Sequence, residues 1–186
     1  MERSNSDIDN SVPLVVDLDG TLIKGDVLFM ELKMLLHKNL FYLFPCLVWL
    51  IKGKVNLKQK IHNLVQIQAE NLPYNDDLLD FLKTEAAGGR RIVLATATLR
   101  SIAVQISKVQ PVFDEVYGTE NGTNLKGKNK LKLLIEKFGE QHFDYIGNSY
   151  SDLTIFSGAR YSYLVNPKKS LIKKTMQVSE LQFVWN

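Results

Sequence analysis

The stretch Pro13-Leu14-Val15-Val16-Asp17-Leu18-Asp19-Gly20-Thr21 decides how this chain folds. Its short apolar run ends in two acids and a Gly-Thr pair, which predicts a buried strand followed by a tight turn. Because side chains alternate along a strand, Asp17 and Asp19 are expected to point to one side where the strand ends. They could also be solvated turn acids. However, a charge at the end of a buried strand costs free energy unless a partner compensates it, which favours a functional role.

Beyond this stretch, short apolar runs alternate with segments of helical periodicity. The pattern predicts strands over 91–96, 115–118, 143–147 and 161–165, and helices over 76–87, 99–109, 128–138 and 151–159. Such alternation is typical of an α/β fold, in which a parallel sheet is covered by helices on both faces. Since ligands bind at the carboxyl ends of parallel strands, the chemistry is expected at that edge of the sheet.

Residues 26–74 break this alternation with a run of helical spacing, which predicts a helical insertion over the carboxyl end of the sheet. Its most apolar part, 40–51, is shorter than the roughly 20 residues of a spanning helix. This part is rich in aromatic residues and is followed by lysines. Two interpretations stay open: an insertion core with a solvated basic face, or an apolar surface with a basic rim that meets lipid head groups or an isoprenoid phosphate.

Composition sets the class of protein. The 186 residues suit one domain with an insertion, and a net charge of +3 is too weak to indicate a nucleic-acid partner. The single cysteine, Cys46, excludes an internal disulfide, fits a reducing compartment and is predicted to be a small core residue. The polar segment 1–11 lacks the pattern of a signal peptide, so a cytoplasmic location is expected.

The two acids of the opening stretch suit phosphoryl transfer. Asp17 is predicted to be the nucleophile, because a carboxylate with an ordinary pKa is ionised near neutral pH. Asp19 is predicted to protonate the leaving group and then to activate water, since a carboxyl group crowded by another can keep its proton. Gly20 and Thr21 are expected to let backbone amides approach the phosphoryl oxygens.

Two later positions are predicted to bind the phosphoryl group. Thr96 closes an apolar strand and, with Ala97 beside it, is expected to contact a phosphoryl oxygen. Lys130 is predicted to supply a positive charge, because it opens an amphipathic helical run. Lys126 and Lys128 lie close by and remain alternatives for that role.

A further pair of oxygen donors follows the predicted strand 143–147. Asn148 and Asp152 are four residues apart across a strand-to-helix turn. With Asp17 and the backbone carbonyl of Asp19 they would form an oxygen-only site, which a hard cation such as Mg²⁺ prefers. The cation would offset the repulsion between an anionic nucleophile and an anionic phosphate.

In this order, the residues resemble the motifs of the haloacid-dehalogenase-like (HAD) hydrolase superfamily, in its phosphoserine-phosphatase-like branch. The resemblance implies a Rossmann-like three-layer core with strand order 5-4-1-2-3 and a helical cap inserted after the first strand. It divides the chain into a core of 12–25 and 75–167, a cap of 26–74, and flanking segments 1–11 and 168–186. It also implies a phosphatase that hydrolyses a small phosphorylated substrate through an aspartyl-phosphate.

The resemblance also bears on substrate and partner. Asp26 is the nearest counterpart of a substrate-binding glutamate in phosphoserine phosphatases, but 26–74 contains no arginine, which disfavours phosphoserine. The stretches 124–130 and 143–149 resemble the phosphatase domain fused to UbiA-type membrane prenyltransferases. This implies a lipid-linked or prenylated phosphate as substrate, and a longer chain at the cytoplasmic face of a membrane. The alternative is a non-catalytic module that docks a membrane prenyltransferase. A dehalogenase is disfavoured, since it needs neither Asp19 nor a metal.

Overall fold

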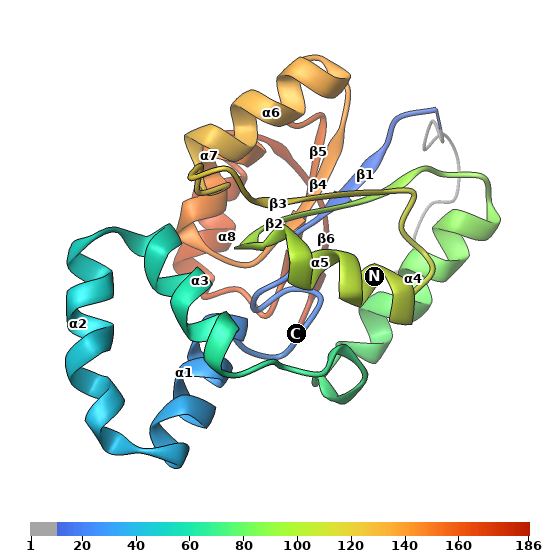
Figure 1. The fold of residues 1–186 in the computed structure, drawn as a ribbon. Helices are drawn as coiled ribbons and strands as arrows, with labels where there is room; N and C mark the ends of the chain where they lie inside the picture. The colour runs from blue at the N-terminus through green and yellow to red at the C-terminus, as the bar shows by residue number, and fades with distance from the viewer. Residues whose placement is uncertain (1–10) are drawn as a thin grey trace.

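A computed structural model describes residues 11–186, and the prediction that no signal peptide is present concerns a segment that mostly lies outside this range. Its centre is one sheet of six parallel strands in the order β3-β2-β1-β4-β5-β6 (Figure 1). The predicted α/β class and the strand order 5-4-1-2-3 are confirmed, with one strand added at the edge beside β5. The strands are β1 (Leu14–Val16), β2 (Ile92–Leu99), β3 (Glu115–Thr119), β4 (Asp144–Gly147), β5 (Tyr161–Val165) and β6 (Glu180–Trp185).

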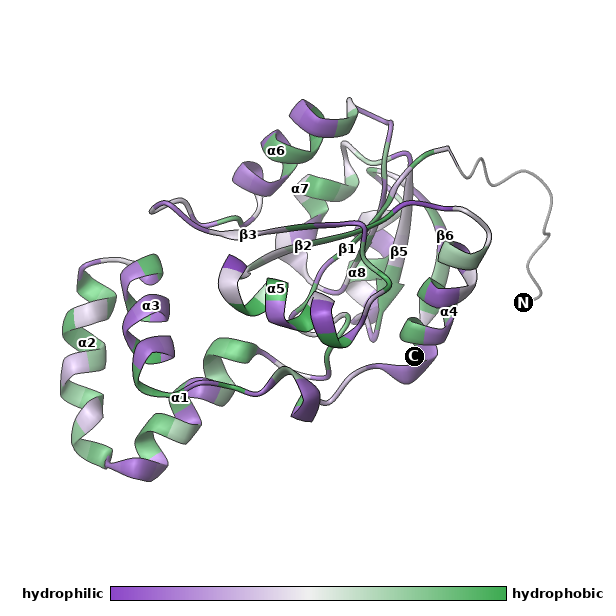
Figure 2. Cartoon of the chain, turned by 45° about the vertical axis from the view of Figure 1, so that its right-hand side comes forward, coloured by the Kyte–Doolittle hydropathy of each residue, from purple (hydrophilic) through white to green (hydrophobic). Residues whose placement is uncertain are grey.

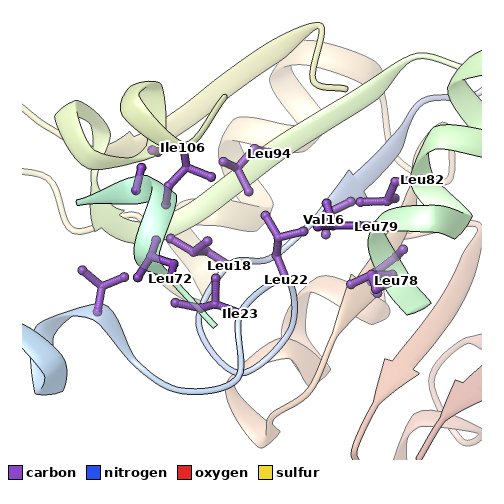
Figure 3. Packing of buried hydrophobic residues seen from close by; sticks show 14 of the residues in the cluster. Val16, Leu18, Leu22, Ile23, Leu72, Leu78, Leu79, Leu82, Leu94 and Ile106 are labelled. Carbon is purple, nitrogen blue, oxygen red and sulfur yellow. The ribbon is translucent and has the colours of Figure 1, made fainter. Parts of the chain in front are cut away.

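Helices cover both faces of the sheet, as the alternation of β1 requires. Val16 faces a core cluster with α4 and α5, whereas Val15 faces a second cluster with α6, α7 and α8. Figure 3 shows the first cluster, where Val16 lies beside Leu79 and Leu82 of α4, and Leu94 lies on the side of Ile106 of α5. The covering helices are α4 (Asp76–Ala87), α5 (Arg100–Val109), α6 (Lys128–Phe138), α7 (Leu153–Phe156) and α8 (Lys169–Thr175), with the 3₁₀ turn η3 (Tyr150–Asp152) before α7.

The segment between β1 and α4 is helical and stands apart from the sheet. It has a small core of its own, formed by Leu35, Cys46, Ile61 and Val65, so the prediction of a buried Cys46 is confirmed. Within the described residues, no helix is both long enough and apolar enough to cross a membrane. The segment consists of α1 (Val27–Lys38), η1 (Leu40–Tyr42), α2 (Leu43–Ile51), α3 (Lys54–Leu64) and η2 (Ala69–Asn71), and we call it the cap.

The carboxyl-terminal part corrects the prediction that 161–165 is the last strand and that 168–186 only flanks the core. Helix α8 and strand β6 follow, and β6 pairs with β5 in parallel. Phe183 and Trp185 pack against the first core cluster, and the ring of Trp185 lies 5.1 Å from that of Phe81 in α4. Phe183 and Trp185 alternate along the strand and face the first cluster, whereas Leu181 packs against the second, because the pairing with β5 shifts its register between Ser162 and Tyr163.

A network of buried charged side chains lies at the amino-terminal edge of the sheet, opposite the predicted site. The carboxylate of Asp144 is fully buried and accepts hydrogen bonds from the guanidinium groups of Arg90 and Arg160. Arg90 also bonds Glu85 at 2.8 Å. A buried charge is tolerated only when it is paired in this way, so these residues serve the fold.

Candidate active site

A tight turn after β1 carries the two acids. Leu22 and Ile23 donate backbone hydrogen bonds to the carbonyls of Asp17 and Leu18, which folds the chain back on itself. The amides of Gly20 and Thr21 donate to the carbonyls of Gly25 and Leu18, at 2.7 and 3.1 Å. These two amides close the turn, and the expectation that Gly20 and Thr21 let backbone amides approach the phosphoryl oxygens stays a prediction. Thr21 is buried, and its hydroxyl has no hydrogen-bond partner.

The amino group of Lys130, in the first turn of α6, donates a 2.7 Å hydrogen bond to Oδ1 of Asp17. It donates a second one of 2.9 Å to the hydroxyl of Tyr145, which in turn donates to Oδ1 of Asp152 at 3.2 Å. Of the three lysines left open by the sequence, Lys130 is the buried one that contacts Asp17, whereas Lys126 and Lys128 are exposed. Sequence reasoning did not name Tyr145 as a site residue, although it lies in β4, directly before the turn that carries Asn148 and Asp152.

Two carboxylates converge here with one lysine. Burial raises the pKa of Asp17 to about 7, opposed by the positive charge of Lys130 and reinforced by the negative charges of Asp152 and Asp19. Lys130 therefore offsets only part of the cost of ionising Asp17. A second positive charge at this edge would complete the compensation.

The second acid, Asp19, is held by two donors. Its Oδ1 accepts a hydrogen bond from the amide of Val27 at 2.8 Å, and its Oδ2 accepts one from the hydroxyl of Thr98 at 2.7 Å. Burial raises the pKa of Asp19, while these two hydrogen bonds lower it. A carboxyl group with a raised pKa can keep a proton near neutral pH, which suits an acid.

Strand β2 extends three residues beyond the predicted end at residue 96, and this extension brings Thr98 to Asp19. Thr96 is fully buried, and its hydroxyl accepts from the amide of Thr98 at 3.0 Å. Ala97 lines the site cavity, and its carbonyl accepts from Lys58 of α3 at 2.5 Å. Thr98 was not predicted as a site residue, although it is two residues from Thr96 along the same strand. Lys58 was noted only as one of the lysines that follow the apolar part of the insertion.

The turn after β4 brings Asn148 and Asp152 to the same edge. Oδ2 of Asp152 accepts from the amide and hydroxyl of Ser149 in a capping box, which fixes this turn. The side chain of Asn148 lies against Gly20: a Cβ built on Gly20 would come within 2.0 Å of Nδ2 of Asn148. Gly20 also has a φ of +73°, so both its backbone and its neighbour require glycine.

These side chains line one cavity of about 510 Å³ between the sheet edge and the cap. The cap contributes Leu28, Leu50, Lys54, Leu57 and Lys58, so this wall is apolar and basic. Lys58 also bonds Oδ1 of Asn124 at 3.1 Å. From the sheet edge come Asp17, Asp19, Gly20, Ala97, Thr98, Lys130, Asn148 and Asp152. Asp26 lies at the rim, where its carboxylate caps α1 by accepting from the amide of Phe29 at 2.9 Å.

The donor set at this edge fits a magnesium ion. Among residues 11–186, no three His, Cys, Asp or Glu side chains lie close enough together to hold a metal by themselves. The predicted set has only two carboxylates, Asp17 and Asp152, joined by the amide of Asn148 and the backbone carbonyl of Asp19. All four donors are oxygens, as a hard cation prefers, and a cation here would offset the burial and the neighbouring carboxylates that raise the pKa of Asp17.

Comparison with solved structures shows that the chain has the fold of the HAD-family hydrolases. A HAD family hydrolase of Salmonella enterica serovar Typhi matches with a TM-score of 0.66 at 14% identity, covering 94% of this chain and 68% of that one. A substrate-bound phosphoserine phosphatase matches with a TM-score of 0.62 at 12% identity over 91% and 92% of the two chains. A phospho-aspartyl intermediate analogue of phosphoserine phosphatase gives 0.61 at 13% identity over 94% and 93%.

Sequence comparison adds a relative whose activity is not described. No protein-family model matches the chain. The uncharacterized protein y4nM of Sinorhizobium fredii (strain NBRC 101917 / NGR234) is 35% identical in an alignment of 165 residues that covers 84% of this chain. The chain spans 30% of the length of that relative.

Proposed function

We propose that this chain, which has the fold of the HAD-family hydrolases, is a Mg²⁺-dependent phosphatase that works through an aspartyl-phosphate. The observation that carries the proposal is the hydrogen bond between Asp17 and Lys130, at an edge where Asp19 and Asp152 also converge. A carboxylate beside an ammonium group, facing a cavity, suits attack on a bound phosphate. The division into core and cap is part of the same proposal.

In the first step, an oxygen of Asp17 attacks phosphorus and the bond to the leaving oxygen breaks. Asp19 gives its proton to that leaving oxygen, and Thr98 and the amide of Val27 hold the carboxyl group in place. Lys130 stays beside Asp17 and stabilises the charge that gathers on the phosphoryl oxygens. Ala97 lines the same cavity, whereas Thr96 is fully buried outside its lining and supports the wall by accepting the hydrogen bond from the amide of Thr98.

In the second step, water attacks the phosphorus of the aspartyl-phosphate. Asp19, now ionised, takes a proton from this water, and the bond between phosphorus and Asp17 breaks to release inorganic phosphate. The residues that would hold Mg²⁺ are Asp17, Asp152, Asn148 and the backbone carbonyl of Asp19. When bound, the ion supplies positive charge that keeps Asp17 ionised and draws the phosphate toward it.

For the substrate we propose a phosphomonoester with an apolar leaving group, such as a lipid-linked or prenylated phosphate. The support is the cap wall of the cavity, where Leu28, Leu50 and Leu57 stand beside Lys54 and Lys58. A membrane prenyltransferase domain as partner and a cytoplasmic location complete the proposal. Since the relative from Sinorhizobium is much longer than this chain, sequence beyond the matched part is the place to seek such a partner.

The test is hydrolysis of an aryl phosphate by the purified chain with Mg²⁺ or with EDTA. The proposal expects turnover only with Mg²⁺, and loss of about a thousandfold or more in Asp17→Asn. Brief reaction with a ³²P-labelled substrate, followed by denaturation, should leave label on the protein that hydroxylamine removes. Full activity of Asp17→Asn, or label that resists hydroxylamine, would exclude the aspartyl-phosphate route. A panel of soluble and isoprenoid phosphates then tests the substrate class.

A further inference from the structure

Helix α2 of the cap is apolar on every side and yet uncovered. Its nine residues, Leu43–Ile51, include no polar side chain, and Cys46 is the only buried one. Figure 1 shows α2 at the outer edge of the molecule, with α3 between it and the rest of the fold. Figure 2 shows the hydrophobic colouring of α2 beside the hydrophilic α3. A helix that is apolar all round is normally buried, so α2 lacks its natural surroundings here.

The exposed apolar residues are concentrated around this helix. Of fourteen large hydrophobic side chains exposed in residues 11–186, eleven lie between Phe29 and Leu64. Phe41 and Ile51 are 76% and 86% exposed. A continuous set this large marks an interaction surface. We call the following set the apolar cap face: Leu40, Phe41, Leu43, Phe44, Leu47, Val48, Leu50 and Ile51.

The cap that carries this face is strongly basic. Between Val27 and Ala69 the only acid is Glu31, which is buried and lies 2.7 Å from Nδ1 of His62. The same stretch holds six lysines, and Lys38 and Lys52 flank the apolar cap face at its two ends. These lysines are Lys33, Lys38, Lys52, Lys54, Lys58 and Lys60. The surface that covers the face must therefore be apolar inside and negatively charged around it.

A bilayer that contains anionic lipids has this chemistry. Its hydrocarbon region accepts Phe and Leu side chains, while its head groups attract lysines at about 1 kcal/mol each. A second copy of the chain fits less well, because a symmetric pair would bring the same lysine rim against itself. At 1.5 Å per residue, nine residues reach about 13 Å, which suits a helix lying in the interface rather than crossing about 30 Å of hydrocarbon.

The apolar cap face is continuous with the active-site cavity. Leu50 belongs to the exposed face and also lines the cavity, as does Lys54, the first residue of α3. We propose that η1 and α2 dock the cap on an anionic lipid bilayer, which places the mouth of the cavity at the level of the head groups. The docking is argued from the apolar cap face and its lysines alone. The inference that the cavity then meets a phosphate at the head groups rests on the proposed phosphatase function.

Co-sedimentation of the full chain with lipid vesicles tests the docking. The wild-type chain should bind vesicles of phosphatidylcholine with phosphatidylserine, and bind phosphatidylcholine alone more weakly. The variant Phe41→Ser/Phe44→Ser should lose about tenfold or more in partitioning, since it removes two exposed aromatic anchors. Lys38→Gln/Lys52→Gln should lose the preference for phosphatidylserine. The matched control is Met176→Ser/Val178→Ser, which removes exposed apolar residues outside the cap and should bind as the wild type does.

Three results would overturn the docking. The first is wild-type chain that stays in solution with anionic vesicles, and the second is equal binding by the wild type and Phe41→Ser/Phe44→Ser. The third is a wild-type dimer in sedimentation velocity that Phe41→Ser/Phe44→Ser dissociates, which would assign the face to a second copy. Aryl phosphate hydrolysis, measured on the same preparations, should be equal in all variants. Vesicle binding without hydrolysis would refute the phosphatase and leave the docking intact.

Discussion

The amino group of Lys130 lies 2.7 Å from Oδ1 of Asp17, although 113 positions separate the two residues in the chain. Asp17 directly follows β1, and Lys130 comes from α6, which packs on the face of the sheet toward which Val15 of β1 points. Both side chains are buried, so the charge of each offsets part of the cost of burying the other. This pair links the stability of the fold to its proposed chemistry.

Lys130→Met should lower the free energy of unfolding by about 3–5 kcal/mol, because it leaves the buried Asp17 carboxylate unpaired. Asp17→Asn/Lys130→Met should be more stable than Lys130→Met, since the unpaired charge is then gone. Urea unfolding of the wild type, both single variants and the double variant, in EDTA, measures the coupling. Additive effects in this cycle would mean that the two side chains do not interact.

The metal-free protein should lose stability as the pH rises from about 4 to about 7. The pKa of Asp17 is near 7 in the folded chain and near 3.8 as its ordinary value, so the folded state holds one more proton between these values. Stability falls wherever the folded state binds more protons, by up to about 1.4 kcal/mol per pH unit. Urea unfolding in EDTA at several pH values measures the slope, which should become smaller in Asp17→Asn. Added Mg²⁺ should restore stability above pH 7. A slope unchanged in Asp17→Asn would locate the titration elsewhere.

Thr98→Val should slow hydrolysis by about tenfold, because Asp19 loses the hydroxyl that holds it at 2.7 Å. The same hydrogen bond lowers the pKa of Asp19. Its loss should therefore shift the limb of the pH–rate profile that Asp19 controls to higher pH. Thr98→Ser keeps the hydroxyl and should retain both the rate and the profile. If the wild type, Thr98→Val and Thr98→Ser have the same pH–rate profile, Thr98 does not position Asp19.

Gly20→Ala should weaken magnesium binding and hydrolysis by about tenfold or more, since its methyl group would displace the side chain of Asn148. Gly89→Ala is the matched control: its φ of +84° is similar, but a Cβ there meets nothing within 4 Å. Both variants should lose about 1 kcal/mol from the positive φ. Calorimetric titration with Mg²⁺ separates this shared cost from the effect on Asn148. Equal magnesium affinity in the two variants would contradict the role of the Gly20 contact.

Arg90→Met should destabilise the chain by about 3–5 kcal/mol and leave kcat and KM unchanged at temperatures where it stays folded. Asp144 would lose a buried partner at the edge of the sheet opposite the cavity. Thermal unfolding and aryl phosphate kinetics on the same sample measure both quantities. A lowered kcat in folded protein would mean that this ion network reaches the active site.

The sequence by itself determined the elements and their order. The apolar run before Asp17 and the later alternation of strands and helices predicted a parallel sheet, because burial on both faces imposes that pattern. The strand order with β1 at its centre was implied by the resemblance to the HAD-like hydrolases, and the structure confirms it. Asp17, Asp19, Lys130, Asn148 and Asp152 were named for the same reason: each follows a strand or opens a helix at one edge. Strand β6 was missed because the resemblance ended the core at residue 167, so the short apolar run of 180–185 was assigned to a flanking segment.

Only the tertiary structure decided which donors meet which acids. The amphipathic run favoured Lys130 but left Lys126 and Lys128 as alternatives, and in the structure Lys130 is the buried lysine that contacts Asp17. Likewise Thr98, Tyr145 and Lys58 became neighbours of the site through contacts between distant elements. A sequence pattern records which side of an element is apolar. Distances between side chains on different elements are set by how those elements pack.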